Sequence, residues 1–497
     1  MKKKQKNRKE KKTQEEEEAR SRRIGACATR RNDDDGQPSR GYLHSLMPLR
    51  DAAQAACVSH AFLRFWRSYG RLDFDIYTLG LLDVGRRLLS FGPIDKELPV
   101  IEDQLRRGVI ATFDEYFEKN SPIIKEFSAR VDHIMHNHVG TGVQTFRLVP
   151  PHGFYINPAV LDRWFQAVIA QGISEFYLYL DMGDEGLGYN FPCSLMRVTG
   201  EELICFLSTS PRLQKLQLSY CNDMVCLKIP HSLSRLKLLL VRNCNSLQTI
   251  GCDAPQLKSF GYDGLPTTQI CLGDSSPLVR EMRMSGIDDE PTGMLCYATT
   301  KLPSVAPNIS SLVLSSCFEI ATPMKKLNKF RRLKYLEIQL HTPRRCPDFD
   351  FYSLVSILNA CPVLATFILR LEMRDADDAI PGDPHGDSSQ RKTHMRGQGR
   401  RKLKNVLTRG FPCAKGLVEL TSHILETAAS LKRLVLDTKY GCHTRDCIGI
   451  CSPLTRKALL EARKAVDVIK TYIESKVPSS VKFKLIEPCA KCHADDA

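Results

Sequence analysis

A spaced apolar pattern recurs through the middle of this chain. Leu213, Leu216 and Leu218 show the spacing L-x-x-L-x-L, and the same spacing, with other apolar residues allowed, starts again at positions 236, 257, 279, 309, 333, 364 and 431. Weaker copies start at Val143 and Ile173. The steps resemble the leucine-rich-repeat period of about 20 to 29 residues. The pattern predicts an α/β solenoid (horseshoe) of parallel strands, because each such repeat buries its apolar face against its neighbours.

Three cysteines share one position in this pattern. Cys221, Cys244 and Cys317 follow their strands where such repeats place an Asn or Cys that serves the turn. We interpret them as structural. The start of the chain has no apolar signal-peptide core, so we expect the 19 cysteines to be reduced thiols.

The charge of the chain is unevenly distributed. There are 71 Lys and Arg residues against 56 Asp and Glu residues, a formal net charge of +15. Residues 1–31 contribute 13 − 5 = +8 and residues 391–409 contribute 8 − 0 = +8, so the remainder sums to 15 − 16 = −1. A uniformly basic surface is therefore not expected in the middle of the chain.

Changes in composition divide the chain into six segments. Residues 1–40 form a disordered basic and acidic leader, because they have almost nothing apolar to bury. The others are a small helical module (41–75), a helical linker (76–126), the repeats (127–371), a disordered basic insertion (372–410), and a last repeat with a C-terminal cap (411–497). The step from Ile173 to Leu213 has no recognisable strand within it, so the solenoid is expected to be shortened or irregular there.

The same features bear on localisation. No apolar run approaches the length of about 18 residues that a membrane-spanning helix needs. We expect the chain in the nucleus, the cytoplasm or both, with no membrane partner. The basic run from Lys2 to Lys12 is equally consistent with a nuclear-import signal and with a solvated tail.

Two groups of residues have the chemistry of metal or haem sites. Cys489, Cys492 and His493 match C-x-x-C-H, and with Cys442, His443, Cys447 or Cys451 they offer zinc ligands. A second group is His133, His136 and His138. Haem attachment requires export, the cysteine groups lie far apart in sequence, and the histidines have no evident fourth ligand. We therefore expect no metal and no cofactor.

Motifs for intrinsic catalysis are also missing. The sequence contains no G-x-x-x-x-G-K-[ST], G-x-S-x-G or H-E-x-x-H motif, so we expect a protein that is not an enzyme and has no catalytic residues. Residues 391–409 could contact a nucleic acid or an acidic protein, but they lack the interleaved aromatics used for base stacking, and a solvated loop is favoured over nucleic-acid binding.

Residues from Tyr42 onward resemble plant F-box/leucine-rich-repeat proteins of the FBD-related, grass-expanded type. Residues 46–62 resemble the second half of an F-box, and residues 127–134 and 461–489 resemble the entry and the ending of the repeat region in that family. The usual opening Leu-Pro and acidic pair of the F-box are replaced here by residues 35–40. The resemblance therefore implies a partial all-α F-box in front of the repeats.

The resemblance implies the substrate-recognition adaptor of an SCF-type cullin-RING E3 ubiquitin ligase. The F-box would bind a Skp-type adaptor subunit, and through it a cullin, while the repeats bind a target protein. By position, the adaptor-binding residues are Leu46, Pro48, Leu49, Val58, Ser59 and Phe62. Strand residues such as Gln214, Gln217, Lys237, Glu337 and Gln339 would face the target, whose identity the sequence does not specify.

Two other hypotheses stay open. The chain could be a leucine-rich-repeat binding scaffold that no longer recruits the ligase. It could also be a nuclear protein that associates with nucleic acid through its basic tails, a mode that weakens steeply with salt.

Overall fold

The computed structural model describes the helical module, the repeats and the last helix and strand. The described residues are 47, 49–66, 69–81, 122–138, 143–151, 156, 158–169, 172–179, 210–222, 224–286, 293–317, 328–342, 351–373, 402–438 and 456–488. They fall into two compact units, Met1–Tyr69 and Gly70–Ala497. The predicted leader (1–40) and most of the linker (76–126) and insertion (372–410) lie outside the described residues.

The first unit contains two short helices, α3 (Leu49–Val58) and α4 (His60–Trp66). An alanine-rich stretch favours the first helix, and Asp51 in its first turn interacts favourably with the helix dipole. Leu49, Ala52 and Ala56 are the buried residues of α3, at spacings of three and four that place them on one face. These helices are compatible with the predicted all-α module.

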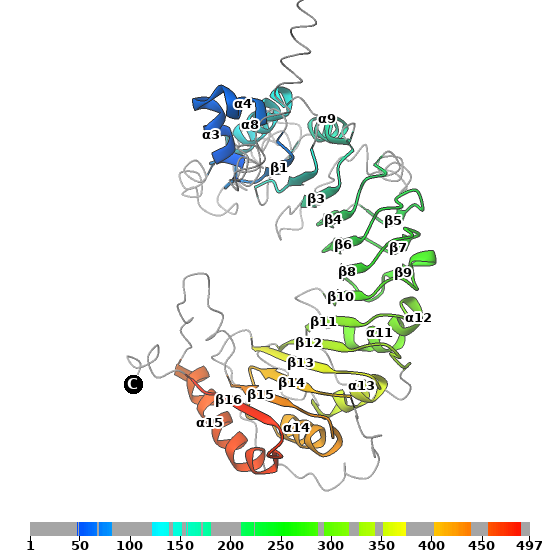
Figure 1. Cartoon of the computed structure of the whole chain (residues 1–497), viewed down its shortest axis with the longest axis vertical. Helices are drawn as coiled ribbons and strands as arrows, with labels where there is room; N and C mark the ends of the chain where they lie inside the picture. Colours follow the sequence, from blue (N-terminus) through cyan, green and yellow to red (C-terminus); the bar gives the residue numbers. More distant parts are fainter. Residues whose placement is uncertain are drawn as a thin grey trace, which may run out of the picture. The chain divides into compact units, whose positions relative to one another are not determined.

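A parallel sheet of 13 strands is the main feature of the second unit (Figure 1). Its strands, in spatial order, are β1 (Arg71–Phe74), β2 (Thr145–Leu148), β3 (Glu175–Tyr179), β4 (Lys215–Ser219), β6 (Leu238–Arg242), β8 (Ser259–Asp263), β10 (Glu281–Ser285), β11 (Ser311–Cys317), β12 (Tyr335–Thr342), β13 (Thr366–Met373), β14 (Asn405–Arg409), β15 (Arg433–Asp437) and β16 (Lys482–Ile486). Spatial order follows chain order, as in a solenoid whose repeats contact only their neighbours. The predicted leucine-rich-repeat solenoid is confirmed.

A second layer covers one face of this sheet (Figure 1). In the middle of the unit it is a narrow parallel sheet of β5 (Cys226–Ile229), β7 (Thr249–Cys252) and β9 (Gln269–Cys271). Elsewhere it contains helices, namely α8 (Pro122–Asn137), α9 (Pro158–Ile169), α11 (Met294–Thr300), α12 (Leu302–Val305), α13 (Leu354–Ala360), α14 (Lys415–Thr427) and α15 (Arg456–Tyr472), with short 3-10 turns at Gly273–Ser275, Phe351–Ser353 and Glu474–Lys476. Among the described residues no helix or strand covers the other face, which is called the open face below (Figure 1).

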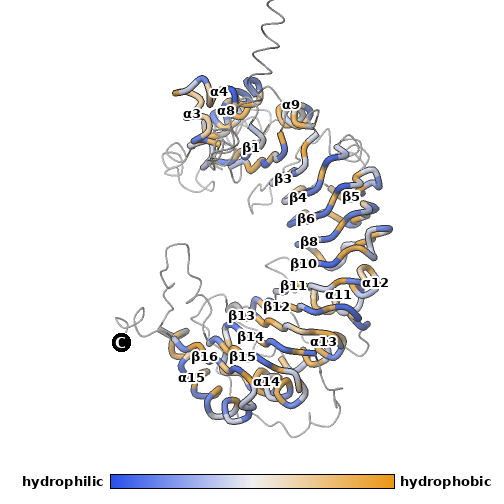
Figure 2. Tube along the Cα trace, in the orientation of Figure 1, coloured by the Kyte–Doolittle hydropathy of each residue, from blue (hydrophilic) through white to orange (hydrophobic). Residues whose placement is uncertain are grey.

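The core lies between the two layers. Along each strand the apolar residues of the repeat pattern point into it, and Figure 2 shows the resulting alternation of hydropathy along the strands. Leu216 and Leu218 are fully buried, and their counterparts Leu239 and Val241 follow in the next repeat of the sheet. Near the first strands, the rings of Phe146 and Phe176 stack with centroids 5.8 Å apart. Aligned apolar side chains therefore join the repeats.

Two strands lie outside the predicted repeat segments. β1 falls within the range 41–75 predicted for the helical module, yet it pairs in parallel with β2. β14 falls within the predicted insertion 372–410 and pairs with both β13 and β15. The predicted boundaries at 75 and 410 are wrong in this respect, because Leu72, Phe74 and Val406 are buried strand residues.

The other predictions about the repeats concern the middle and the end of the array. β3 pairs directly with β4, so the large sheet continues from one to the other, while the residues between them, 180–209, lie outside the described residues. The predicted C-terminal helix and strand are confirmed as α15 and β16, and β16 pairs with β15. In the part of the chain that the structure describes, no helix is both long and apolar enough to cross a membrane.

Gly410 follows β14 in a conformation that an L-residue rarely adopts. Its φ is +68°, and an added Cβ would meet the backbone carbonyl of Leu371. We expect Gly410→Ala to lower the free energy of unfolding by about 2 kcal/mol, because neither the left-handed backbone nor the carbonyl can relax cheaply. Urea unfolding followed by circular dichroism measures the effect.

Gly416→Ala is the matched control for this substitution. Gly416 lies in α14, and a Cβ there would make only ordinary contacts, starting at 3.5 Å from the backbone nitrogen of Phe351. Alanine should leave the stability unchanged or raise it by up to about 1 kcal/mol. Equal effects of the two substitutions would contradict the strain assigned to Gly410.

Candidate functional site

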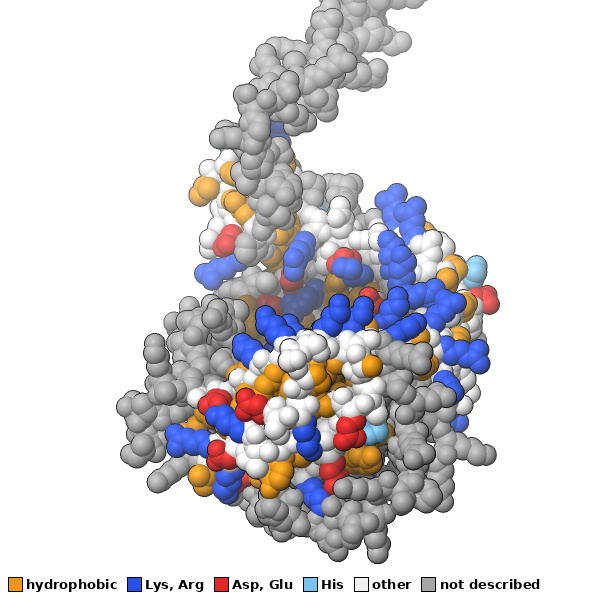
Figure 3. Space-filling view, turned by 60° about the horizontal axis from the view of Figure 1, so that its bottom comes forward, with side chains coloured by type: hydrophobic (Ala, Val, Ile, Leu, Met, Phe, Trp, Pro, Cys, Tyr) orange, Lys and Arg blue, Asp and Glu red, His pale blue; other side chains and the backbone are white. Residues whose placement is uncertain are grey.

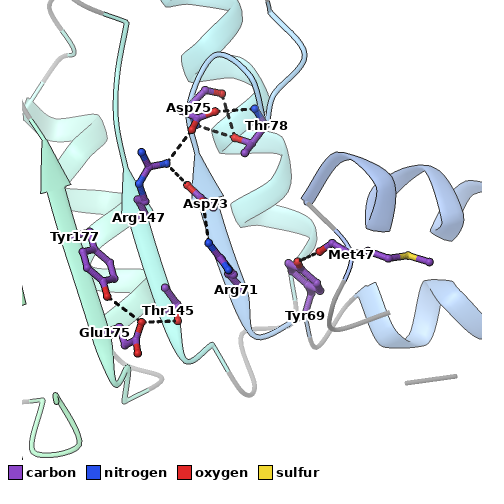
Figure 4. Close-up of polar contacts among 10 residues, drawn as sticks. All are labelled: Met47, Tyr69, Arg71, Asp73, Asp75, Thr78, Thr145, Arg147, Glu175 and Tyr177. Carbon is purple, nitrogen blue, oxygen red and sulfur yellow. Dashed lines mark hydrogen bonds and ion pairs between the residues drawn. The ribbon is translucent and has the colours of Figure 1, made fainter. Parts of the chain in front are cut away.

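The helices α3 and α4 form the first candidate surface. They are separated at Ser59, whose carbonyl oxygen accepts a hydrogen bond from the amide of Leu63 at 2.9 Å. After α4, the Tyr69 ring stacks on Trp66 with centroids 5.9 Å apart. The Tyr69 hydroxyl donates a hydrogen bond to the carbonyl oxygen of Met47, just ahead of α3 (Figure 4). These contacts join the start and the end of the helix pair.

The six predicted adaptor-binding residues differ in their surroundings. Val58 is 85% exposed at the end of α3, and Ser59 and Phe62 are partly exposed. Leu49 is only 3% exposed and packs on the buried face of α3, so it is not a surface residue of this chain, and its role in the adaptor contact stays a prediction. Leu46 and Pro48 lie outside the described residues. An exposed valine next to partly exposed aromatic rings is a small apolar surface suited to a partner helix.

The open face of the large sheet is the second candidate surface. Gln217 on β4 and Glu337 and Gln339 on β12 are partly exposed strand residues, as predicted. Gln214 and Lys237 lie one residue before their strands instead. The face also has apolar residues at partly exposed positions: Leu238, Leu240, Val313, Ile368 and Leu407. It therefore combines hydrogen-bonding groups with apolar contact area, as protein interfaces do.

Ion pairs connect neighbouring strands of the open face. Arg147 on β2 contacts Asp73 on β1 at 2.5 Å and Asp75, just after β1, at 2.8 Å (Figure 4). The amide of Thr78 also donates a hydrogen bond to Asp75 at 2.7 Å. Burial alone would raise the pKa of Asp75, but the bonds from Thr78 and Arg147 outweigh burial and hold the pKa below its ordinary value. This cluster joins the first two repeats.

A second cluster joins the next two strands. Glu175 on β3 pairs with Lys215 on β4 at 2.8 Å. It also accepts a hydrogen bond from the hydroxyl of Tyr177 at 3.1 Å (Figure 4). Burial would raise the pKa of Glu175, but Lys215 and Tyr177 together lower it. Lys215 balances the charge of Glu175, and Arg71, 3.4 Å from Asp73, balances the first cluster, so both clusters contribute geometry more than net charge.

A third cluster lies on β12 and β13. Arg370 forms an ion pair with Glu337, which also accepts a hydrogen bond from the hydroxyl of Tyr335. Burial, and to a smaller extent the carboxylate of Glu337, raise the pKa of Tyr335 to about 12. The phenol therefore stays protonated at neutral pH and acts as a donor.

The residues predicted as metal or haem candidates are not brought together where the structure describes them. His133 and His136 are exposed on α8, and His138 is buried beyond its end. The described residues contain no group of three or more His, Cys, Asp or Glu side chains arranged to hold a metal ion. Cys489, Cys492, His493 and residues 442–451 lie outside the described residues.

Cys221 and Cys244 serve the turns after β4 and β6, as predicted. Each thiol donates to the carbonyl oxygen two residues before it, Ser219 for Cys221 at 3.8 Å and Arg242 for Cys244 at 3.4 Å. The hydrogen bond from Cys221 outweighs burial and lowers the pKa of Cys244. The side chain of Cys317 lies outside the described residues.

Comparisons with known proteins give similarities for the repeats. The family described as the leucine-rich-repeat domain of At1g61320/AtMIF1 matches residues 134–198 and 195–490. A protein of Arabidopsis thaliana named as an FBD-associated F-box protein, At1g61330, is 25% identical over 274 residues. That alignment covers 52% of this chain and 60% of the relative, so the chain spans less than two thirds of the relative's length. Both matches agree with the predicted resemblance to plant F-box/leucine-rich-repeat proteins of the FBD-related type.

Arg147→Gln should weaken the contact between β1 and β2. The change removes the cation that bridges Asp73 and Asp75 and leaves only Arg71, 3.4 Å from Asp73, so we expect the free energy of unfolding at pH 7 to fall by about 1 kcal/mol. Because the pKa of Asp75 is lowered in the folded chain, its stabilisation is present above its unfolded value and lost as the pH falls through the folded one. The loss caused by the substitution should therefore shrink at acidic pH.

Arg163→Gln is the control for this experiment. Arg163 also pairs with an aspartate, Asp132, at 2.7 Å, but its side chain is 61% exposed. We expect a loss below about 0.5 kcal/mol from such an exposed pair. Thermal unfolding between pH 3 and pH 7 compares the two variants, and a pH-independent loss in Arg147→Gln would contradict the assignment to Asp75.

Proposed function

The chain belongs to the At1g61320/AtMIF1 leucine-rich-repeat domain family, and we propose that it is the substrate-recognition adaptor of an SCF-type cullin-RING ubiquitin ligase. In this proposal α3 and α4 bind a Skp-type adaptor subunit, and through it a cullin. The repeats hold the protein to be ubiquitinated. Transfer of ubiquitin belongs to other subunits, so the chain itself is not an enzyme and acts in the nucleus or the cytoplasm.

The observation that carries the proposal is the exposure of Val58. A valine side chain that is 85% exposed loses the free energy that burial would provide, which is about 1.5 kcal/mol or more for a fully buried Val. Phe62, on the next helix, is also partly exposed. In the part of the first unit that the structure describes, α3 and α4 leave these side chains exposed or partly exposed, and a partner helix would bury them.

The open face supports the second half of the proposal. Its polar clusters are fixed between strands, as in the pairing of Arg370 on β13 with Glu337 on β12. Leu240, Ile368 and Leu407 add apolar area at partly exposed positions. Because these residues belong to a continuous sheet, the surface is rigid before binding, which lowers the entropic cost of association.

One observation favours a different function for the helix pair. Leu49, which the resemblance to the F-box assigns to the adaptor contact, is buried within the first unit. Without Leu49 the surface offered to the adaptor subunit is smaller. A smaller adaptor contact would favour a leucine-rich-repeat scaffold that binds its target without recruiting a ligase. The same binding experiment separates the two functions.

Val58→Asp should weaken recruitment of the Skp-type adaptor. An unpaired carboxylate in the centre of an apolar contact costs about 2 kcal/mol or more, which weakens binding about 30-fold. The measurement is co-purification of the full chain with a plant Skp-type subunit, followed by titration calorimetry. Val225→Asp is the control, since Val225 is 49% exposed on the repeat array and should not affect this binding.

Three outcomes have different meanings. Binding by the wild type that only Val58→Asp weakens supports the ligase adaptor. Absence of binding by the wild type removes the ligase role and leaves the scaffold. Equal binding by the wild type and by Val58→Asp shows that the contact surface lies elsewhere.

A further inference from the structure

A single repeat position places six basic residues in one line. The residue just after the first buried apolar residue of each repeat lies where its strand begins. In eight consecutive repeats of the large sheet this residue is Lys237, Lys258, Arg280, Ser310, Lys334, Ala365, Lys404 and Lys432. The six basic members are called the basic edge. Counting charge by segment conceals them, because five of the six lie in the part of the chain that sums to −1 and Lys404 is counted with the basic run 391–409.

Backbone hydrogen bonds hold these eight positions in register. The amide of Lys258 donates to the carbonyl oxygen of Lys237 at 2.9 Å, and the amide of Arg280 donates to that of Lys258 at 2.8 Å. The same bond continues without a gap through Ser310, Lys334, Ala365 and Lys404 to Lys432. Adjacent strands lie about 4.8 Å apart, so seven such steps place the basic edge along a line of about 34 Å.

The charges of the basic edge are available to a partner. Lys237, Lys258, Lys334, Lys404 and Lys432 are exposed, and Arg280 is partly exposed. None of the six forms an ion pair with another residue in the described ranges; Lys237 instead contacts the side-chain oxygen of Gln214 at 3.0 Å. Lysine and arginine side chains gather in a band on the face drawn in Figure 3.

Neighbouring positions strengthen this charge. The turns that precede the same strands add four exposed basic residues, which are Arg235, Arg331, Arg332 and Lys402. The strand position that follows the basic edge contains one acidic residue in these eight repeats, Glu281, which accepts a hydrogen bond from Ser259 at 2.7 Å. Six exposed or partly exposed cations, aligned and close together, thus create a local positive potential in a nearly neutral array.

The geometry favours an acidic polypeptide over a nucleic acid. Two aromatic residues lie beside the basic edge, but Phe330 is buried and the hydroxyl of Tyr335 is bound to Glu337, so the line has no row of free rings on which successive bases could stack. Glu281 and Glu337 on the open face next to the line would repel the second row of phosphates of a duplex. Five of the six residues are lysines, whose ammonium groups act as point charges and accept carboxylates without a fixed orientation.

We propose that the basic edge binds an extended acidic segment of a partner protein, with Asp or Glu at several of about ten consecutive residues. An extended chain rises about 3.3 Å per residue, so about ten residues cover the 34 Å line. The proposal names the chemical class of the target and rests on the part of the proposed function that assigns target binding to the repeats. It does not depend on recruitment of a ligase by α3 and α4.

The test measures binding of short labelled probes to the full chain by fluorescence anisotropy. The probes are a ten-residue peptide that alternates Glu and Ser, the same peptide with Gln for Glu, a ten-nucleotide RNA and a DNA duplex of similar length. The edge variant combines Lys258→Glu, Lys334→Glu and Lys404→Glu. Its control combines Lys228→Glu, Lys301→Glu and Arg463→Glu, which change the same charge at exposed sites away from the edge.

We expect the edge variant to bind the acidic peptide about tenfold more weakly, since three exposed ion pairs each contribute about two- to threefold. The control variant should bind within about twofold of the wild type, and affinity for the Glu peptide should fall with salt. Melting temperatures check that both variants fold. If the reversals prevent folding, Gln at the same three edge positions should weaken binding by a smaller factor.

Three results would overturn the proposal. Equal losses of affinity for the Glu peptide in the edge and control variants would assign binding to net charge or to the basic residues elsewhere in the chain. Equal affinity for the Glu and Gln peptides would remove the role of charge. Tighter binding of RNA or DNA than of the Glu peptide, lost in the edge variant, would make the edge a nucleic-acid surface. Retained binding of a Skp-type subunit in each case would leave the ligase proposal intact.

Discussion

The architecture depends on the parallel backbone ladder between consecutive repeats. Each strand pairs with the strand of the next repeat, from β1 to β16, so a given position of the repeat always meets its counterpart. This register sets both faces at once. It stacks Leu216 on Leu239 in the core, and it aligns Glu175 with Lys215 on the open face. A one-residue slip would exchange the two faces, which is why the apolar spacing is so regular.

Most of the fold could be predicted from the sequence, because a repeat makes one local signal visible many times. The strands at 215, 238, 259, 281, 311, 335, 366 and 433 all begin where the pattern places them. β1 and β14 could not be recognised as easily. Thr408 occupies a position of β14 at which other repeats have an apolar residue, and the basic run before that strand suggested an exposed loop. Pairing with β13 and β15 overrides that local composition.

The candidate site was harder to predict than the fold. Position in a motif assigned Leu49 and Val58 to one contact surface, but the packing of two short helices buries the first and exposes the second. The basic edge was hidden for another reason. Its six residues are 21 to 70 positions apart in sequence, and acidic residues between most of them offset their charge, so only the strand pairing brings them into line.

The repeat position occupied by the basic edge has a consequence for how binding can vary. Its side chains contribute nothing to the core, as the presence of Ser310 and Ala365 at two of the eight places illustrates. A substitution there changes the charge of the line by one step while the buried apolar neighbours stay the same. The number of repeats therefore fixes the length of the acidic segment that the array can hold. The residues at this single position set how many charged contacts the array makes with that segment. Affinity and folding stability are in this way under separate control.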